Sequence, residues 1–342
     1  MSFNKMRPLL YCTGATVIFL LYYVYLEKLG TYKIEQQQTF YPPSNRNFLR
    51  NINDGYHKLL NIHFRYKHIP ELCNESDRYV IGVISSPDHL ENRNIIRLTW
   101  GQKALGIKVF FLIANTTDEA LQLSINSESL AFRDIVQGDF HDSYQNLSYK
   151  HVMALKMVED NCPNIKYLVK VDDDTFVNTP NLKEFLDQYD QKYGNSSNLL
   201  CNIMEYSPAL RDGRWKVSVE MFSGEYYPKY CSGYFIIYPM AAISAIYRES
   251  QNENVKFLWV DDAFVSGVLA EKAGINHTSV RKLSLDYVNV TKFMEDFEEF
   301  GGRPFLVGRM NLDTGDLKTL WAFLKDHVPK TNILERLELH HL

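Results

Sequence analysis

Residues 167–177 read Tyr-Leu-Val-Lys-Val-Asp-Asp-Asp-Thr-Phe-Val, an apolar run that stops at three consecutive carboxylates. The run before the acids has the length and the composition of a buried strand. In open α/β sheets, ligands bind at the carboxyl ends of the strands. We therefore expect Asp172, Asp173 and Asp174 to lie at the ligand-binding edge of a sheet.

The chain before this stretch alternates between short apolar runs and segments with helical spacing. Strand-like runs occupy 79–84, 109–113 and 134–136. Helical patterns occupy 90–100, a segment that Thr116 or Thr117 could cap, and 146–159. Strands that alternate with helices favour a parallel sheet covered by helices, so the expected fold class is α/β.

Three adjacent carboxylates repel one another unless a cation neutralises them. If the strand continues, Asp172 and Asp174 point to the same face, and paired hard oxygen ligands suit Mg²⁺ or Mn²⁺. A metal held there could also bind the diphosphate of a nucleotide-sugar, with Lys170 as a second positive group. An acidic triplet is often only a solvated cluster, but this one lies between two apolar segments. An EF-hand is excluded because Val177 stands where that loop requires glycine.

A second acidic pair, Asp261-Asp262, follows the apolar segment 257–260. The simpler interpretation is that Asp262 caps a helix over 263–273. The alternative is a general base, because an inverting sugar transfer needs a carboxylate that takes a proton from the acceptor hydroxyl. A carboxylate at the start of a helix can do both.

The composition and the N-terminus constrain the location of the protein. The 342 residues carry a net charge of −4 and no basic stripe, so a nucleic-acid partner is not expected. The 19 residues of 8–26 contain no charged or amide side chain and would span about 28 Å as a helix, close to the bilayer core. Lys5 and Arg7 precede them, which predicts a cytosolic N-terminus. The rival interpretation is a cleaved signal peptide. The predicted organisation is a cytoplasmic tail 1–7, a transmembrane signal-anchor 8–26, a luminal stem 27–72 and a luminal catalytic domain 73–342.

Cysteines and sequons agree with a luminal domain. Four cysteines follow the anchor, and they could form two disulfides in any of three pairings. They are Cys73, Cys162, Cys201 and Cys231. Six Asn-x-Ser/Thr sequons also follow the anchor, which predicts a glycoprotein.

Five blocks, in order, carry a family resemblance. They are RNIIRLTWG at 93–101, DIVQGDFHDSYQNLSYK at 134–150, KVDDDTFVN at 170–178, YPKYCSG at 227–233, and Asp261-Asp262. From about residue 78 to residue 275 the chain resembles the β-1,3-glycosyltransferases of glycosyltransferase family 31. This family includes β-1,3-galactosyltransferases and β-1,3-N-acetylglucosaminyltransferases.

The resemblance implies a GT-A (Rossmann-like) fold, an inverting mechanism and a β1,3 linkage. It implies Asp262 as catalytic base, with Asp261 the second candidate, and Asp172 and Asp174 as ligands of Mn²⁺ or Mg²⁺. The implied positions at or behind the nucleotide-sugar are Arg93, Arg97, Lys150, Lys170, Asp172 and Asp173. Two positions depart from the family pattern: Phe235 stands where many members have glycine, and Ser266 makes the spacing from Asp262 to Gly267 one residue longer.

The expected activity is transfer of galactose from UDP-galactose to the 3-hydroxyl of GlcNAc or GalNAc on a glycoprotein or glycolipid. A transferase that moves N-acetylglucosamine from UDP-GlcNAc to galactose uses the same motifs and stays an alternative. A non-catalytic sugar-binding scaffold is a more distant alternative, because the candidate metal ligands and bases Asp172, Asp174, Asp261 and Asp262 are all present. The family and the anchor together predict a single-pass type II protein of the Golgi membrane.

Overall fold

The computed structural model describes residues 57–71, 73–102, 107–194, 196–286, 290–299, 305–309, 314–326 and 333–334. The predicted tail and anchor, 1–26, lie outside the described residues, as does the part of the predicted stem before residue 57. Among the helices of the described ranges, none is both long enough and apolar enough to cross a membrane.

The centre of the fold is a parallel sheet of the kind predicted. Its strands are β4 (Tyr79–Ile84), β5 (Lys108–Asn115), β6 (Ile135–His141) and β7 (Tyr167–Asp172). They pair in the order β7-β4-β5-β6, all parallel. Helices α2 (Leu90–Leu98), α3 (Glu119–Phe132) and α4 (Leu147–Asn161) connect them. The predicted caps of α3 were wrong, because Asp118 caps it by accepting a hydrogen bond from the backbone N–H of Leu121.

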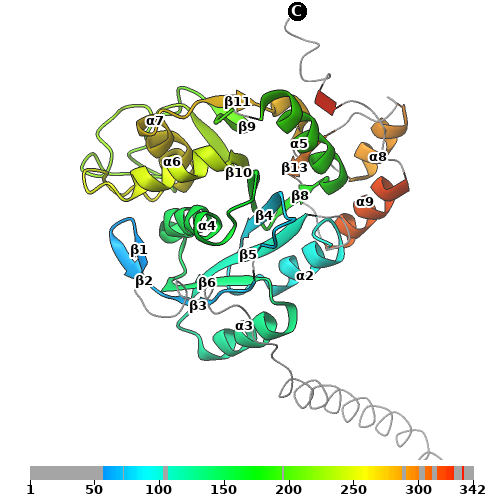
Figure 1. Ribbon diagram of the computed structural model, residues 1–342, viewed down its shortest axis with the longest axis horizontal. Coiled ribbons are helices and arrows are strands. Elements are labelled where there is room, and N and C mark those ends of the chain that lie inside the picture. The colour runs from blue at the N-terminus through cyan, green and yellow to red at the C-terminus, as the bar shows by residue number, and fades with distance from the viewer. Residues whose placement is uncertain are drawn as a thin grey trace, which may run out of the picture. The chain divides into compact units, whose positions relative to one another are not determined.

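Antiparallel strands extend the sheet on both sides to eight strands (Figure 1). β10 (Tyr230–Pro239) pairs with β7, β9 (Leu199–Met204) pairs with β10, and both pairings are antiparallel. β11 (His277–Ser279) lies parallel to β9 at one edge, and β3 (Tyr66–His68) lies antiparallel to β6 at the other. Because β10 is antiparallel to both β7 and β9, the strands β7 and β9 run in the same direction.

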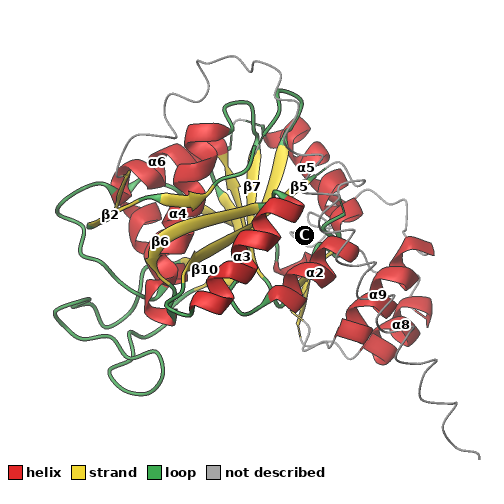
Figure 2. Ribbon diagram, turned by 90° about the horizontal axis from the view of Figure 1, so that it is seen from below, coloured by secondary structure: helices red, strands yellow, loops and turns green. Residues whose placement is uncertain are grey.

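Alternating side chains of the strands divide the buried apolar residues into two cores, one on each face of the sheet. Val80 and Leu112 pack on the face covered by α4 and α6 (Met240–Ser250). Ile81 and Phe111 pack on the opposite face, in one cluster with side chains of α2 and α5 (Thr179–Tyr193). Figure 2 shows these helices on the two sides of the strands. The sheet is therefore the middle layer of three.

A second, smaller sheet stands beside the last helices. It has the order β12-β13-β8, with β8 (Thr175–Val177) directly after the acidic triplet. β12 (Ser284–Asp286) and β13 (Val307–Arg309) come from much later in the chain. Helices α8 (Val290–Glu299) and α9 (Thr314–Asp326) contact each other through the rings of Phe297 and Phe323.

The fold begins before the predicted stem boundary. β1 (His57–Leu59) and β2 (Ile62–Phe64) form a hairpin, and β3 joins the main sheet. The side chains of Leu59 and Phe64 are fully buried in the core next to α4. Residues 57–71 are thus part of the folded domain, and the predicted boundary at residue 73 was too late.

The cysteines pair as Cys73–Cys162 and Cys201–Cys231, one of the three possible arrangements. The first disulfide joins the segment before β4 to the end of α4. The second joins β9 to β10 across neighbouring strands.

We expect Phe64→Ala to lower the free energy of unfolding by about 3–5 kcal/mol, because it leaves a cavity between the hairpin and α4. The control is His63→Ala, which removes the exposed neighbour on the same strand. Denaturant unfolding of the full-length chain measures both. Equal effects of the two variants would mean that the hairpin does not contribute to the core.

Candidate active site

The acidic triplet lies where the strand order of the sheet changes direction. From β4 the chain proceeds through β5 to β6 on one side, and β7 then returns to the other side of β4. Ile84 and Asp172 are partners in the register of β4 and β7, so the two strands end side by side. Such a switch point is where open α/β sheets bind ligands, because the two connections leave in opposite directions.

The strand does not continue through the three carboxylates, so the condition under which Asp172 and Asp174 would share one strand face is not met. β7 ends at Asp172, and residues 173–174 form a turn before β8. The turn is tied to β4, since the backbone N–H of Asp173 donates to the carbonyl of Ile84 at 3.2 Å. The turn makes the three side chains differ in environment.

Asp173 faces the protein. Its side chain is 9% exposed, accepts a hydrogen bond of 2.7 Å from Ser85 Oγ, and pairs with His89 Nδ1 at 2.8 Å. The side chain of Asp172 is 39% exposed to solvent, and Asp174 is exposed. Two of the three carboxylates therefore have oxygens available to a ligand.

Lys170 is the buried cation of the site. Its Nζ donates to Asp172 Oδ1 at 2.7 Å and to the carbonyl of Gly233 at 2.5 Å, and it lies 4.0 Å from Asp261 Oδ2. Burial by itself would lower the pKa of Lys170, but the negative charges of Asp172 and Asp261 together have the larger effect. The net pKa is therefore raised, and the ammonium stays charged. Partial burial raises the pKa of Asp172 against the opposing effect of Lys170.

The two carboxylates of the second acidic pair have pKa values shifted in opposite directions. Burial would raise the pKa of Asp261, but Lys170 and a hydrogen bond from His151 hold it at about 2. Burial and the neighbouring charge of Asp261 raise the pKa of Asp262 to about 7. Asp262 also accepts a hydrogen bond of 2.7 Å from the backbone N–H of Ala263, as the helix-cap interpretation predicted. Asp261 is thus a fixed anion, and Asp262 can exchange a proton near neutral pH.

His151 was not among the residues predicted from sequence. Its ring is fully buried on α4, with Nδ1 2.9 Å from Asp261 Oδ2 and Nε2 2.8 Å from the Tyr238 hydroxyl. Burial lowers the pKa of His151, so the ring is neutral and holds Asp261 by a hydrogen bond rather than by charge. The available signal was its position directly after the matched block 134–150, in a segment with helical periodicity.

Asp262 opens a π-helix, η4 (Ala263–Leu269). A π-turn accommodates one residue more than an α-turn, which accounts for the longer spacing seen in the sequence. The extra position is used, because Ser266 Oγ accepts from the backbone N–H of Cys231 at 2.9 Å and donates to the carbonyl of Asp262 at 2.6 Å. Gly233 lets β10 approach, since a Cβ there would lie 3.1 Å from Cβ of Asp262. The other departure, Phe235, is buried in the core of the opposite face.

Three of the predicted basic residues lie behind the site. Arg93 is fully buried, and all five of its N–H donors are used. They bond to both carboxylate oxygens of Glu128, to Ser85 Oγ, and to the carbonyls of Ser86 and Pro87. No donor of Arg93 remains for a ligand, so it supports the turn after β4.

Arg97 and Lys150 are also engaged within the protein. Arg97 pairs with Glu128 and Asp134 at 2.7 and 2.8 Å. Lys150 Nζ is buried, donates to the carbonyl of Ser85 at 2.9 Å, and pairs with Asp142 at 3.0 Å. Lys150 therefore braces the carboxyl ends of β4 and β6, and Arg97 joins α2 to α3 and to the residue before β6. Both positions agree with the supporting role that the sequence left open.

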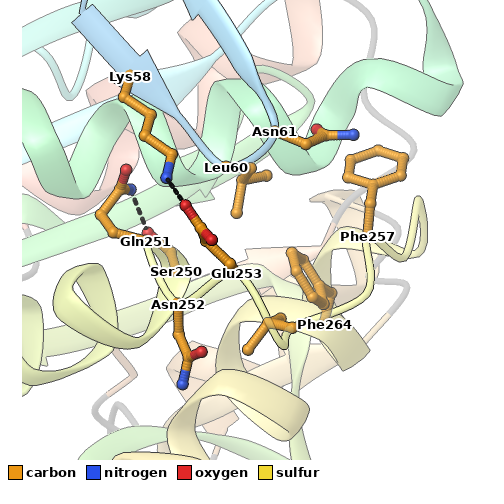
Figure 3. Close-up of a pocket in the computed structure, with 10 residues that line it drawn as sticks. Lys58, Leu60, Asn61, Ser250, Gln251, Asn252, Glu253, Phe257 and Phe264 are labelled. Atoms are coloured by element: carbon orange, nitrogen blue, oxygen red, sulfur yellow. Dashed lines mark hydrogen bonds and ion pairs between the residues drawn. The ribbon is translucent and has the colours of Figure 1, made fainter.

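A pocket of about 260 Å³ lies apart from these acids (Figure 3). It is formed by the β1–β2 turn, the end of α6 and the side chains of Phe257 and Phe264, and none of the five site carboxylates lines it. Lys58 and Glu253 face each other across it at 3.9 Å. The buried Gln251 Oε1 there receives no hydrogen bond.

The galactosyltransferase family profile matches residues 91–281, which contain both acidic clusters, Lys170 and His151. The chain belongs to the galactosyltransferase family. This confirms the resemblance to glycosyltransferase family 31.

Curated relatives of this galactosyltransferase-family protein agree in the type of linkage that they form. It is 32% identical to human UDP-GalNAc:β-1,3-N-acetylgalactosaminyltransferase 1 over 59% of the chain and 62% of that protein. It is 31% identical to human lactosylceramide 1,3-N-acetyl-β-D-glucosaminyltransferase over 62% of the chain and 59% of that protein. It is 28% identical to β-1,3-galactosyltransferase 5 of Pan paniscus over 80% of the chain and 85% of that protein. The match thus spans about three fifths of the first two relatives.

We expect Arg93→Ala to lower the free energy of unfolding by about 3–5 kcal/mol, because it leaves Glu128 buried without its bidentate partner. Arg93→Met combined with Glu128→Leu removes both charges and should recover part of the loss. Arg281→Ala, at an exposed arginine, is the control. If Arg93→Ala unfolded like the wild type while donor affinity fell, Arg93 would bind the donor directly.

Proposed function

We propose that this protein is an inverting, UDP-sugar-dependent β-1,3-glycosyltransferase. The observation that carries the proposal is the position of Asp262, which lies against Gly233 of β10, while Lys170 joins the carbonyl of Gly233 to Asp172 at the end of β7. The names of the relatives support the β-1,3 linkage.

The residues at the end of β7 fit a divalent cation. The oxygens of Asp172 and Asp174 are hard ligands of the type that Mn²⁺ and Mg²⁺ take, and neither carboxylate is enclosed by protein donors as Asp173 is. Within the described ranges, no group of three or more His, Cys, Asp or Glu side chains converges on a metal position. We propose Asp172 and Asp174 as the metal ligands, and the bound ion would supply positive charge to the diphosphate leaving group.

Asp262 is the proposed base. In a direct displacement the acceptor 3-hydroxyl attacks the anomeric carbon, its proton passes to the Asp262 carboxylate, and the bond to the diphosphate breaks. A base performs best when its pKa lies near the working pH, which favours Asp262 over Asp261. Asp261 keeps Asp262 basic by its fixed negative charge, and Lys170 limits the repulsion between these groups and Asp172.

The proposed donor is UDP-galactose, with GlcNAc or GalNAc as the acceptor sugar on a glycoprotein or glycolipid. Transfer from UDP-GlcNAc to galactose stays the alternative, since the human lactosylceramide relative is named for N-acetylglucosamine. The human N-acetylgalactosaminyltransferase relative adds UDP-GalNAc to the donors to be tested. A scaffold without activity is disfavoured, because Asp172, Asp174, Asp261 and Asp262 are all present.

The fold and the location complete the proposal. A mixed α/β sheet with a carboxylate cluster at its switch point agrees with the GT-A fold that the resemblance implies. We further propose that residues 8–26 anchor the chain in the Golgi membrane, with the catalytic domain in the lumen. The two disulfides support this, because disulfides persist in secretory compartments.

We expect purified full-length protein to release UDP from one of UDP-galactose, UDP-GlcNAc and UDP-GalNAc when Mn²⁺ and an acceptor sugar are present. Asp262→Asn should lower kcat by about 10²–10⁴-fold, the usual contribution of a general base. Asp174→Asn should lower activity most at low Mn²⁺, because it weakens the metal site. The exposed Glu271 provides the control, Glu271→Gln, which should behave as the wild type. Folded protein that neither binds nor turns over any donor would contradict the proposal.

We expect kcat/KM to fall as the pH drops below about 7, because protonated Asp262 cannot accept the acceptor proton. The same raised pKa predicts a separate effect on stability. The unfolded carboxyl loses its proton near its ordinary value of 3.8, and the folded one only near 7, so the group costs stability that develops between these values. Asp262→Asn should therefore melt at a higher temperature than the wild type at pH 8, with the difference shrinking toward pH 4. A pH-independent difference would mean that the pKa is not raised.

A further inference from the structure

The loop between β9 and β10, residues 205–229, exposes aromatic side chains. Tyr206 is 83% exposed, Tyr226 is 52% exposed and Trp215 is 48% exposed. Large exposed apolar side chains that gather in one place mark interaction sites. Because β9 runs parallel to β7, this loop leaves the sheet at the same edge as the acidic triplet.

The loop has a defined structure. The guanidinium of Arg211 donates to three carbonyls of the loop, those of Val217, Phe222 and Gly224, at 2.7–3.1 Å. Two backbone bonds join its two sides: the N–H of Ala209 donates to the carbonyl of Glu225, and the N–H of Tyr227 donates to the carbonyl of Ser207. The backbone of the loop that carries Trp215 is therefore held in place outside the core, as a preorganised binding surface would require.

The loop also reaches the turn that follows β6. The indole N–H of Trp215 donates to the hydroxyl of Tyr144 at 2.8 Å, and Tyr144 belongs to the short helix η3 (Tyr144–Asn146). The guanidinium of Arg214 lies 5.0 Å from the ring centre of Tyr144 and 5.6 Å from that of Trp215. Tyr144 in turn lies 5.7 Å from Trp259, ring centre to ring centre.

Trp259 connects this surface to the catalytic carboxylates. It precedes Asp261 by two residues, and its backbone neighbour Leu258 accepts a hydrogen bond from Ser148 of α4. The aromatic rings thus form a continuous series from the exposed loop to the segment that carries Asp262. The surface lies on the side of the base, which must contact the acceptor, and the metal ligands belong to a different segment.

We propose that Trp215, Tyr144 and Arg214 form a stacking subsite for a pyranose ring of the acceptor glycan, beyond the sugar that receives the transfer. The inference rests on the proposed function. A pyranose has an apolar face of C–H groups that fits a half-exposed ring such as Trp215 or Tyr144. Its hydroxyls can accept hydrogen bonds from Arg214, which is exposed and held over both rings. This chemistry selects an acceptor of at least two sugars over a single sugar.

The test compares steady-state kinetics of full-length variants on mono- and disaccharide β-glycosides that end in galactose, GlcNAc or GalNAc. Trp215→Ala should raise the acceptor KM for disaccharides by about 3–10-fold, the range of one ring-stacking contact, and leave donor KM and kcat unchanged. Trp215→Phe keeps a ring but loses the hydrogen bond to Tyr144, so its acceptor KM should lie between those of the wild type and Trp215→Ala. Tyr206→Ala, at the most exposed aromatic of the same loop, is the matched control and should equal the wild type.

Saturation-transfer NMR with the same glycosides measures acceptor binding without turnover, so it tests the subsite independently of the proposed activity. Loss of disaccharide contacts in Trp215→Ala, with contacts kept in Tyr206→Ala, would support the subsite even if no donor were turned over. A rise in donor KM instead of acceptor KM would overturn it, because the rings would then contact the nucleotide. Equal acceptor KM and equal NMR contacts in the wild type and Trp215→Ala would also overturn it.

Discussion

Several carboxylates lie close together at one edge of the sheet, and their repulsion must be offset by a nearby positive charge. The buried ammonium group of Lys170 supplies that charge. Its ammonium group lies between the end of β7, the carbonyl of Gly233 on β10 and Asp261 before η4. Three segments that are far apart in the chain are thereby held at one point. Without this cation, Asp172, Asp261 and Asp262 would repel one another in a poorly hydrated space, and breaking such a buried pair usually costs about 3–5 kcal/mol.

The charge of Lys170 also sets the difference between the two neighbouring acids. Asp261 lies closer to Lys170 and His151 and stays ionised, so its charge adds to the effect of burial on Asp262. A single arrangement thus yields one anion and one proton acceptor from two consecutive identical residues. The π-helix and Gly233 then keep Asp262 in place against β10.

The parallel strands and their helices could be predicted, because each strand is a local apolar run and each helix has its own periodicity. The strands of 57–68 could not, since they are three residues long and mix polar and apolar side chains that only the tertiary structure buries. The small sheet was equally hidden, because its three strands come from residues 175–177, 284–286 and 307–309. Pairing between such distant short segments leaves no local pattern in the sequence.

The site was predicted in its residue types and only partly in its geometry. The two acidic clusters could be found because runs of carboxylates after apolar segments are unusual. The turn at Asp173 and the role of His151 depend on hydrogen bonds to β4 and β10, which no spacing reveals. The arginines of α2 show the same limit, because a basic residue in a motif can contact a ligand or brace the fold, and only burial distinguishes the two.

The disulfide Cys201–Cys231 closes a covalent ring around the whole aromatic loop. A protease that cuts the loop once would therefore yield two fragments that stay joined, and that separate on a gel only after reduction. The two ends of the loop are fixed on adjacent strands by this bond as well as by the strand pairing. A loop of another length or composition could therefore replace it while Asp172, Asp261 and Asp262 stay in place.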